Sequence, residues 1–460
     1  MKKLISLLAV IVLCATVAFS CGKGNGGAEK GSKSTAISSF SPSTTHEEIP
    51  SDATEIRTEE DLKAVKNDLN GKYYLGCNIT LDEDFETIGS YDEPFSGYFN
   101  GNGYSIDGLK IKSGALSVDG SSAELFVGLF ACVTGTVEKL TLNAFTVNVD
   151  EQFISSCGYN ELLAQNQTAV LSGAVAITDF DIHVGVAGNN KGILNEINAS
   201  VNFSVKPSCE TARLRVGVLA GKNSGKITCC VSVGEISCES DDGYIRVGGT
   251  AGYCNASSKV VECKSSMRIN AKTTNGGKIN AGGIIGNMEC GEAYRCYGEG
   301  SITTNNVQGK KTASGGLIGL VDNTDAYVLD LTTNAYSKSD KLTKNGSMGI
   351  IVKNCYANVT LQENTSTKKG ARGAFIGQLS VFATVDTQIF IKENGALGEV
   401  KGTLNDKGGF SGSYEVFDGV NALAVTNYSL DYFEFVDNKC VASDSLAQKT
   451  SVVVPDDIGF

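Results

Sequence analysis

The chain has 460 residues, with 54 glycines, five prolines, two histidines and no tryptophan. Glycine at about 12% exceeds the usual level of roughly 7%, and so few prolines exclude collagen-like and proline-rich disordered chains. A net charge of −12 without basic runs makes nucleic acid an unsuitable partner, because an acidic surface repels phosphate. The two histidines exclude a metal centre that needs several of them.

Residues 1–21 have the pattern of a secretory signal, because two lysines precede an apolar stretch from Leu4 to Phe19. That stretch is short for a transmembrane helix, which needs about 20 residues. A small residue followed by Cys21 resembles the lipobox of bacterial lipoproteins, which implies cleavage after residue 20 and acylation of the cysteine. We therefore expect a lipid anchor in the cell envelope, at the outer membrane on its periplasmic or outward side. A plain secretory signal and an uncleaved anchor are the alternatives.

The next segment, residues 21–53, is rich in Gly, Ser and Thr with scattered charge. Such a composition buries little apolar surface and predicts a flexible linker behind the lipid. No later segment reaches 18 consecutive apolar residues, so we expect no further membrane span.

Two features then recur with a period of about 33 residues, which indicates a repeat architecture. The first is a short run ending on a ladder position, occupied in turn by Leu140, Ile197, Cys230, Cys263, Cys296 and Cys355. The second is a glycine-ended run, such as VGVLAG, and these runs end on residues 188, 221, 252, 286, 319 and 377. Between them lie alternating apolar and polar residues, which are typical of strands. We expect an all-β solenoid of 31–34-residue coils with three short strands each.

The segments RCYGEG (295–300) and NCYANV (354–359) resemble the GLUG motif of bacterial surface proteins. The segment at 94–111 resembles the opening coil that accompanies those repeats, and the likeness extends over residues 54–400. The resemblance implies a right-handed parallel β-helix at the cell surface, and it implies no catalytic residue.

Both ends of a stacked sheet need covering, because their strand edges are unpaired. Thr58 begins a near capping box, Leu62 and Val65 share one face, and Gly71 ends the pattern, which predicts a capping helix found nowhere else in the chain. We expect the N-terminal cap and first coil at 54–115, the repeats at 116–405 and an aromatic-rich C-terminal cap at 406–460.

Fifteen cysteines in an exported chain suggest disulfides, but the ladder position argues against them. Leu and Ile occupy it in sister coils, so Cys230, Cys263 and Cys296 are expected to be buried, unpaired thiols. Disulfides and a metal site are the alternatives. Cys229, which precedes a ladder cysteine, is expected to be the most accessible thiol.

The sequence offers little evidence of catalysis. Pectin-hydrolysing β-helix enzymes carry NTD, DD, GHG and RIK in that order, whereas this chain has only 323–325 and 241–242, in the wrong order. The column before the ladder residue is mixed in charge, as in a solvated face; it reads Lys139, Glu196, Cys229, Glu262, Arg295 and Asn354. Acidic clusters at 82–84 and 239–242 are read as solvated loops, and His183 as structural. We therefore assign no catalytic, cofactor or metal residue, and the ligand-binding residues stay unknown.

Two inserts break the period, at 141–183 and 320–350, and they either bind a ligand or are ordinary loops. The function we expect is non-catalytic adhesion, or binding of a glycan or host surface. The expected partners are the membrane, through the lipid, and a polysaccharide or host-surface macromolecule. A divergent polysaccharide lyase or glycoside hydrolase, or a structural envelope component, is the alternative.

Overall fold

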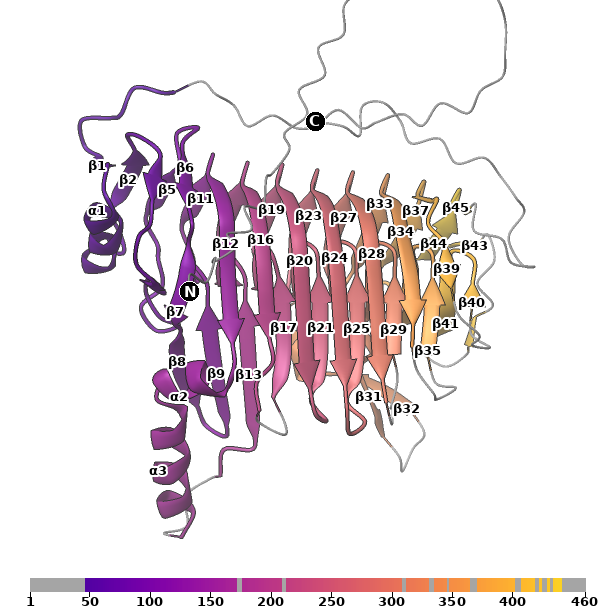
Figure 1. Ribbon diagram of the computed structural model, residues 1–460. Helices are drawn as coiled ribbons and strands as arrows, with labels where there is room; N and C mark the ends of the chain where they lie inside the picture. The colour runs from indigo at the N-terminus through magenta and orange to yellow at the C-terminus, as the bar shows by residue number, and fades with distance from the viewer. Residues whose placement is uncertain are drawn as a thin grey trace, which may run out of the picture. The chain divides into compact units, whose positions relative to one another are not determined.

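The computed structural model describes residues 46–171, 176–208, 212–307, 312–330, 335–345, 347–364, 370–401, 407–417, 422–423, 428–430 and 433–440. Within these residues the chain winds as an all-β parallel β-helix, as the sequence predicts (Figure 1). The expected signal peptide, Cys21 and most of the expected linker lie outside the described residues. No helix among the described residues is both long and apolar enough to cross a bilayer.

One complete coil contains four short strands rather than the three we expected. In the coil at 226–254 these are β19 (Lys226–Thr228), β20 (Val231–Ser240), β21 (Tyr244–Gly248) and β22 (Ala251–Cys254). The glycine-ended run is two strands, because the chain turns sharply after Gly248, where a Cβ would lie 2.2 Å from the carbonyl oxygen of Ala251. Ile227, Ile236 and Ile245, from three strands of this coil, are fully buried inside it.

Each of the four strands pairs with its equivalents in the neighbouring coils, so four sheets run through the stack. The first sheet contains, in spatial order, β1 (Thr54–Ile56), β2 (Lys72–Leu75), β5 (Tyr98–Asn100), β11 (Thr136–Glu138), β15 (Ile193–Asn195), β19, β23 (Lys259–Val261), β27 (Gly291–Tyr294), β33 (Ile350–Lys353), β37 (Ile389–Lys392), β44 (Phe433–Val436) and β43 (Tyr428–Leu430). The second sheet contains β3 (Ile79–Thr80), β6 (Ser105–Asp107), β12 (Thr141–Val149), β16 (Asn198–Val205), β20, β24 (Lys264–Thr273), β28 (Tyr297–Asn306), β34 (Tyr356–Glu363), β38 (Gly395–Ala396) and β45 (Lys439–Cys440), with β4 (Phe85–Glu86), β7 (Lys110–Ser113) and β39 (Val400–Lys401) beside this path.

The third and fourth sheets arise from the glycine-ended runs and the strands before them. The third contains β40 (Lys407–Gly408), β35 (Gly370–Gly373), β29 (Thr312–Gly315), β25 (Lys278–Gly282), β21, β17 (Arg213–Gly217), β13 (Asp179–Val184), β9 (Ser122–Val127) and β8 (Ala115–Asp119). The fourth contains β10 (Phe130–Val133), β14 (Ala187–Asn190), β18 (Ala220–Asn223), β22, β26 (Ile285–Met288), β30 (Ile318–Asp322), β36 (Ile376–Phe382), β41 (Ser411–Phe417) and β42 (Ala422–Leu423). The segment expected to be the C-terminal cap thus contributes strands to all four sheets.

A short helix stands at the N-terminal end of the coils, as predicted. α1 (Glu59–Ala64) begins at Thr58, whose side chain forms the capping box with Asp61, and Leu62 is fully buried. The helix continues only as the 3-10 turn η1 (Val65–Asn67), so it ends before Gly71.

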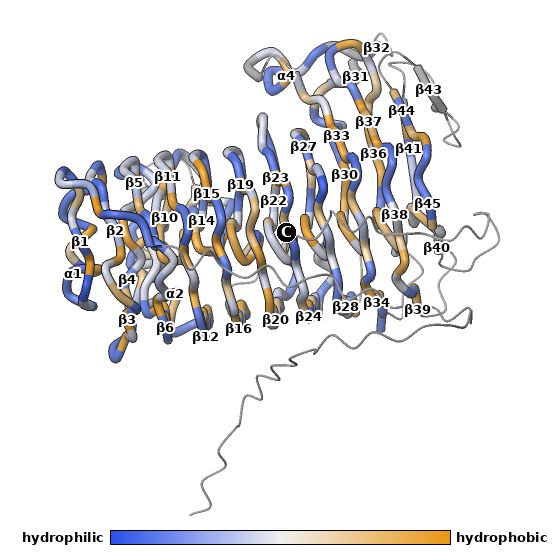
Figure 2. Tube along the Cα trace, turned by 90° about the horizontal axis from the view of Figure 1, so that it is seen from above, coloured by the Kyte–Doolittle hydropathy of each residue, from blue (hydrophilic) through white to orange (hydrophobic). Residues whose placement is uncertain are grey.

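The two inserts contain helices, so the expectation that the capping helix is found nowhere else in the chain is wrong. The first forms α2 (Glu151–Ser156) and α3 (Tyr159–Leu171), and α3 projects from the coils (Figure 1). The second forms η2 (Thr324–Ala326), an antiparallel hairpin of β31 (Tyr327–Asp330) and β32 (Ala335–Lys338), and α4 (Asp340–Asn345). Figure 2 shows β31, β32 and α4 projecting from one side of the stack.

The ladder cysteines are interior, as expected. Cys230, Cys263 and Cys296 are fully buried, and no disulfide joins any of the cysteines among the described residues. Each thiol also has a carbonyl partner in the preceding coil; the Sγ of Cys263, for example, lies 3.7 Å from the oxygen of Ile227. The ladder is therefore a column of apolar or weakly polar side chains inside the stack.

The column before the ladder has a backbone role that we did not foresee. Lys139, Glu196, Cys229, Glu262, Arg295 and Asn354 all have φ between 51° and 54°. These left-handed residues form the bend from the first sheet to the second, so their mixed side chains mark a corner rather than a flat solvated face. Cys229 is only half-buried, but burial and the nearby Glu262 raise the pKa of its thiol to about 11.

We predict that the ladder tolerates apolar residues and rejects charge. Cys263→Val should lower the free energy of unfolding by less than about 1.5 kcal/mol, because the volume changes little. Cys263→Asp should lower it by at least about 3 kcal/mol, because the carboxylate would be buried without a partner. Denaturant unfolding measures both.

The matched control for this prediction is Cys229→Asn at the adjacent bend. Asn354 holds the same position in another coil and tolerates the left-handed backbone, so this change should be mild. A Cys263→Asp protein as stable as the wild type would show that the ladder is not interior.

Candidate functional site: a polar corner between the third and fourth sheets

Charged side chains line the outward face of the third sheet near its N-terminal end. On β13, Asp181 and His183 alternate with residues that face the core. Parallel pairing sets Glu124 of β9 beside Asp181, and Arg215 of β17 beside His183. Arg246 of β21 pairs in turn with Arg215. Stacked strands lie about 4.8 Å apart, so these side chains form a continuous row.

The fourth sheet presents a second row to the first. Asn189, Lys222, Tyr253 and Asn287 pair in register along β14, β18, β22 and β26. The rows meet where the Nε of Arg246 donates to the Oδ1 of Asn287 at 3.2 Å, and where the guanidinium lies 5.0 Å from the ring centroid of Tyr253.

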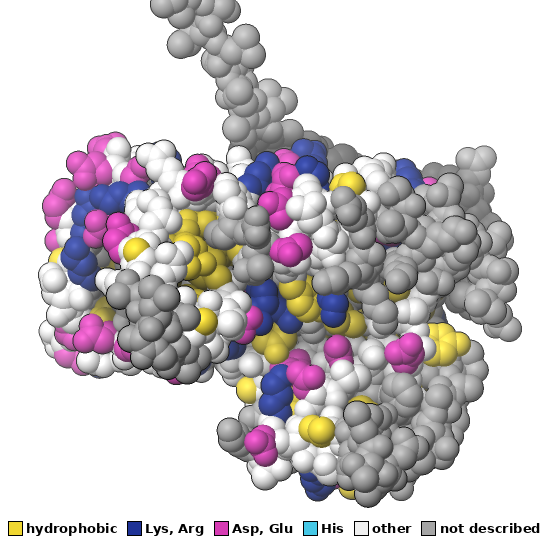
Figure 3. Space-filling view, turned by 90° about the horizontal axis from the view of Figure 1, so that it is seen from below, with side chains coloured by type: hydrophobic (Ala, Val, Ile, Leu, Met, Phe, Trp, Pro, Cys, Tyr) yellow, Lys and Arg dark blue, Asp and Glu magenta, His cyan; other side chains and the backbone are white. Residues whose placement is uncertain are grey.

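We call this region the polar corner, and it consists of Glu124, Asp181, His183, Asn189, Arg213, Arg215, Lys222, Tyr244, Arg246, Tyr253, Asn287 and Glu289. In the space-filling view of Figure 3 the molecule is hollowed beside a projecting lobe, and Lys and Arg side chains gather in the hollow.

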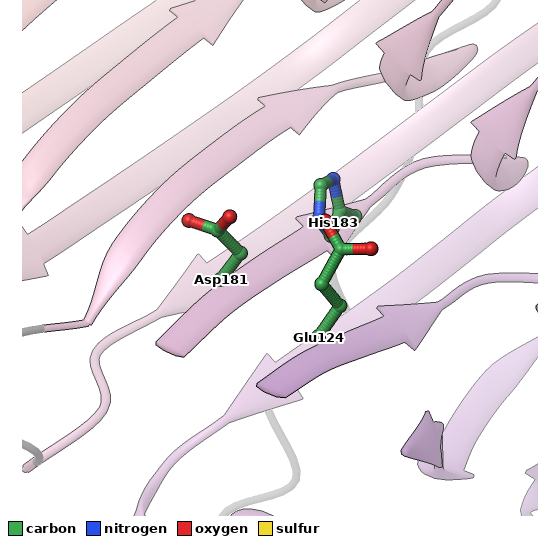
Figure 4. Close-up of side chains that lie close together, drawn as sticks. All are labelled: Glu124, Asp181 and His183. Atoms are coloured by element: carbon green, nitrogen blue, oxygen red, sulfur yellow. The ribbon is translucent and has the colours of Figure 1, made fainter. Parts of the chain in front are cut away.

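Three side chains at one end of the corner have the composition of a metal site. Ligand atoms of Glu124, Asp181 and His183 lie within 4.8 Å of one another, and Figure 4 shows them on the neighbouring strands β9 and β13. Arg215 already supplies the positive charge, because its Nη1 lies 2.9 Å from Asp181 and 3.1 Å from the Nε2 of His183. Arg213 adds two contacts to Asp181, at 2.6 and 3.0 Å. A guanidinium occupies the place of the cation, so we do not assign a metal here.

His183 is unsuited to act as a base on a bound molecule. It is fully buried and stacks on Phe126 with ring centroids 4.8 Å apart. Burial lowers the pKa of His183 to about 4, with Arg215 adding to the effect while Glu124 and Asp181 oppose it. The imidazole is therefore neutral at pH 7, and its Nδ1 has no partner among the described residues.

Toward the other end of the corner lies a cation, Arg246, that lacks a carboxylate partner among the described residues. Arg246 forms no ion pair with a described acidic side chain, and its buried Nη1 has no hydrogen-bond partner there. Nearer the first end, the Nε of Arg215 and both amide atoms of Asn189 are likewise buried and unpartnered among the described groups. Burial lowers the pKa of Lys222, and Arg215 adds to this although Glu124 opposes it. Positive charge at this end is costly and incompletely neutralised.

Two tyrosines flank the guanidinium of Arg246. The Tyr244 ring lies 3.9 Å from it, and the Tyr253 ring also lies 5.3 Å from the guanidinium of Arg215. The Tyr253 hydroxyl donates to Glu289. Burial, followed by the charge of Glu289, raises the pKa of Tyr253 well above its usual value. The corner thus combines aromatic faces with guanidinium groups.

The sequence carried a signal for this corner that we did not use. The residue before each glycine-ended run forms one outward column, which reads His183, Arg215, Arg246, Asn280, Ala313 and Ala371. We analysed the column before the ladder instead, and we considered His183 alone. Extending the alignment by one residue would have revealed the adjacent arginines.

The other candidates from the sequence stand apart from the corner. Asn323 is fully buried, and its side chain bonds to the backbone of Phe382, which is a structural role. Asp82 and Asp242 are exposed, as expected for solvated loops.

Comparison with known proteins adds little to this geometry. No protein-family model matches the chain, and no curated protein matches it. The chain is similar to the crystal structure, at 1.30 Å resolution, of a Bacteroides ovatus protein proposed to be an immunoglobulin A1 protease. The identity is 14%, the match covers 85% of this chain and 84% of that one, and the TM-score is 0.38. The GLUG resemblance therefore stays a prediction.

We predict that His183 makes the fold sensitive to acid. Its pKa of about 4 lies below the ordinary 6.5, so the unfolded chain takes up a proton first as the pH falls. Stability is therefore lost between pH 6.5 and 4, by roughly 3 kcal/mol at most. Unfolding free energies of the wild type and His183→Gln at pH 7 and 4.5 measure this loss.

The chain's other histidine supplies the control. His46 is exposed, so His46→Gln should keep the acid sensitivity of the wild type, whereas His183→Gln should reduce it. Equal pH slopes in all three proteins would contradict the assignment.

Proposed function

We propose that this chain is a lipid-anchored β-helix protein of the bacterial cell envelope, and that its polar corner binds an acidic glycan without catalysis. The observation that carries the proposal is Arg246, a largely enclosed guanidinium with a buried, unpartnered Nη1 and no described carboxylate beside it. Desolvated cations need an anionic partner, and a bound anion would supply one.

The register of the strands strengthens the case for an anion. Arg215 and Arg246 lie opposite each other on adjacent strands, where like charges repel. An anion between them would remove that repulsion and accept charge-assisted hydrogen bonds from both. The chain as a whole carries −12, so this positive site is a local feature rather than a consequence of overall charge.

A sugar is the anion carrier that the surroundings favour. Tyr244 and Tyr253 offer aromatic faces beside the guanidinium groups, which suit the apolar face of a sugar ring. The rows extend over several coils, so an extended chain could contact equivalent positions in turn. An acidic polysaccharide combines these features.

The chemistry of the corner favours binding over a lyase or hydrolase reaction. His183 is fully buried, so it cannot reach a substrate. The raised pKa of Tyr253 and its bond to Glu289 make the phenol a poor base at neutral pH. Asp181 is nearly buried and is held by two arginines. Glu124 is held by His183 and Arg215. Arg246 and Lys222 are hydrogen-bond donors, which suit binding of an anion rather than abstraction of a proton.

We predict that Arg246→Gln weakens binding of an acidic oligosaccharide by at least roughly tenfold, because it removes a charge-assisted contact. Calorimetry with oligogalacturonate, a sulfated glycosaminoglycan fragment and a neutral oligosaccharide measures it. The acidic probes should bind the wild type more tightly than the neutral one, and more weakly at high salt.

Arg268→Gln is the matched control, because Arg268 is exposed on the second sheet and contacts Glu235. It should leave affinity unchanged. Wild-type protein that shows no preference for any acidic probe, or Arg246→Gln protein that binds as the wild type does, would refute the proposed site.

The lipid anchor is a separate prediction, and it rests on Cys21. Cys21→Ala should abolish incorporation of labelled palmitate and move the protein from the detergent phase to the aqueous phase. Cys14→Ala tests the other cysteine of the apolar stretch and should leave labelling intact. Unchanged labelling of the Cys21→Ala protein would show that the lipid is elsewhere or absent.

A further inference from the structure

The second insert reaches the polar corner through one continuous line of contacts. Lys341, on α4 of the insert, contacts Glu289, and the other carboxylate oxygen of Glu289 accepts from the Tyr253 hydroxyl. The Tyr253 ring then lies 5.0 Å from the guanidinium of Arg246. Only the corner end of this line, the Tyr253 ring and Arg246, would touch the ligand of the proposed function.

From this line we infer that Lys341 and Glu289 are positioning residues for the anion site, so that the insert tunes the affinity of a corner that it does not itself form. The inference rests on the proposed function for its ligand. Lys341 holds in place the carboxylate of Glu289, which accepts from the Tyr253 hydroxyl. It also neutralises that carboxylate, so that Glu289 does not pair with an arginine of the corner.

The burial of Glu289 explains why its engagement matters. The residue is 6% exposed, and a carboxylate so enclosed requires a cation. Lys341 supplies it, and the same ammonium also contacts Asp325 at 2.9 Å. Without Lys341, Glu289 would be attracted to the cations of the corner. The first of these is Arg246, which lies beside the same tyrosine, Tyr253. The protein's own carboxylate would then compete with the ligand for the guanidinium.

Two successive substitutions should therefore change the affinity for an acidic probe in opposite directions. Lys341→Met should weaken binding of an acidic probe by roughly three- to tenfold, because it frees Glu289. Adding Glu289→Gln should restore most of the affinity, because glutamine still accepts from Tyr253 but carries no charge. A role in stability alone would let the second substitution add to the damage rather than reverse it.

A reporter that needs no glycan separates this inference from the proposed function. The chain has no tryptophan, so Tyr244→Trp places a single tryptophan beside Arg246 as a fluorescent reporter. Iodide, an anion, should quench it more strongly than neutral acrylamide in full-length protein, because the corner is positive. Lys341→Met should reduce the iodide quenching, and Lys341→Met/Glu289→Gln should restore it.

Lys338→Met is the matched control, because Lys338 belongs to the same insert but contacts Asp386 at 2.8 Å, away from the corner. It should change neither quenching nor affinity. Two results would overturn the inference. One is equal iodide quenching with and without Lys341→Met. The other is quenching that Glu289→Gln fails to restore in a protein with the wild-type melting curve. If no acidic probe binds but the quenching pattern holds, the glycan proposal fails and the positioning role stands.

Discussion

The in-register stacking of parallel strands is the constraint on which the rest of this structure depends. Each residue lies beside its equivalent in the next coil, about 4.8 Å away, so one position in the coil becomes a column with a single environment. The interior ladder shows the consequence for packing: Leu140, Ile197 and Cys263 occupy equivalent, fully buried positions. The left-handed bend shows the consequence for the backbone, since very different residues adopt almost the same φ there. A column accepts any side chain that meets its one requirement.

The same constraint makes a column of charges costly, which is why the polar corner is informative. Where the column alternates in sign, as between Asp181 and Arg213, each side chain neutralises its neighbour. Where neighbours in the column carry the same charge, as Arg215 and Arg246 do, stacking holds them close together and they repel each other. No carboxylate among the described residues pairs with Arg246 to offset this repulsion. Packing alone would favour replacing such an arginine. Under the proposed function, a bound anion would offset this repulsion.

The sequence predicted the solenoid because its evidence is periodic. The 33-residue spacing of Cys230, Cys263 and Cys296 needs no knowledge of packing, and the capping box at Thr58 is a local signal. The fourth strand was missed because VGGTAG looks like one apolar run, and only the close approach of Gly248 to Ala251 reveals the turn within it. The helices of the first insert were missed because, beyond the N-terminal cap, we followed only period-two alternation. The corner was missed because its two rows come from different strands of the coil, and which rows face each other depends on the angle of that turn.

The in-register stacking also explains what the inserts can add to the coils. A side chain in a repeated coil must suit the column of equivalent positions to which it belongs. A side chain needed at only one place in the stack is therefore more easily supplied by a segment outside the repeat. Lys341 illustrates this, because an ammonium facing Glu289 comes from α4 rather than from an adjacent coil. The regular stack supplies the adjacent guanidinium groups of Arg215 and Arg246, and the irregular insert supplies the cation that contacts Glu289. An insert of this kind can change the affinity of the corner without altering any column of the β-helix.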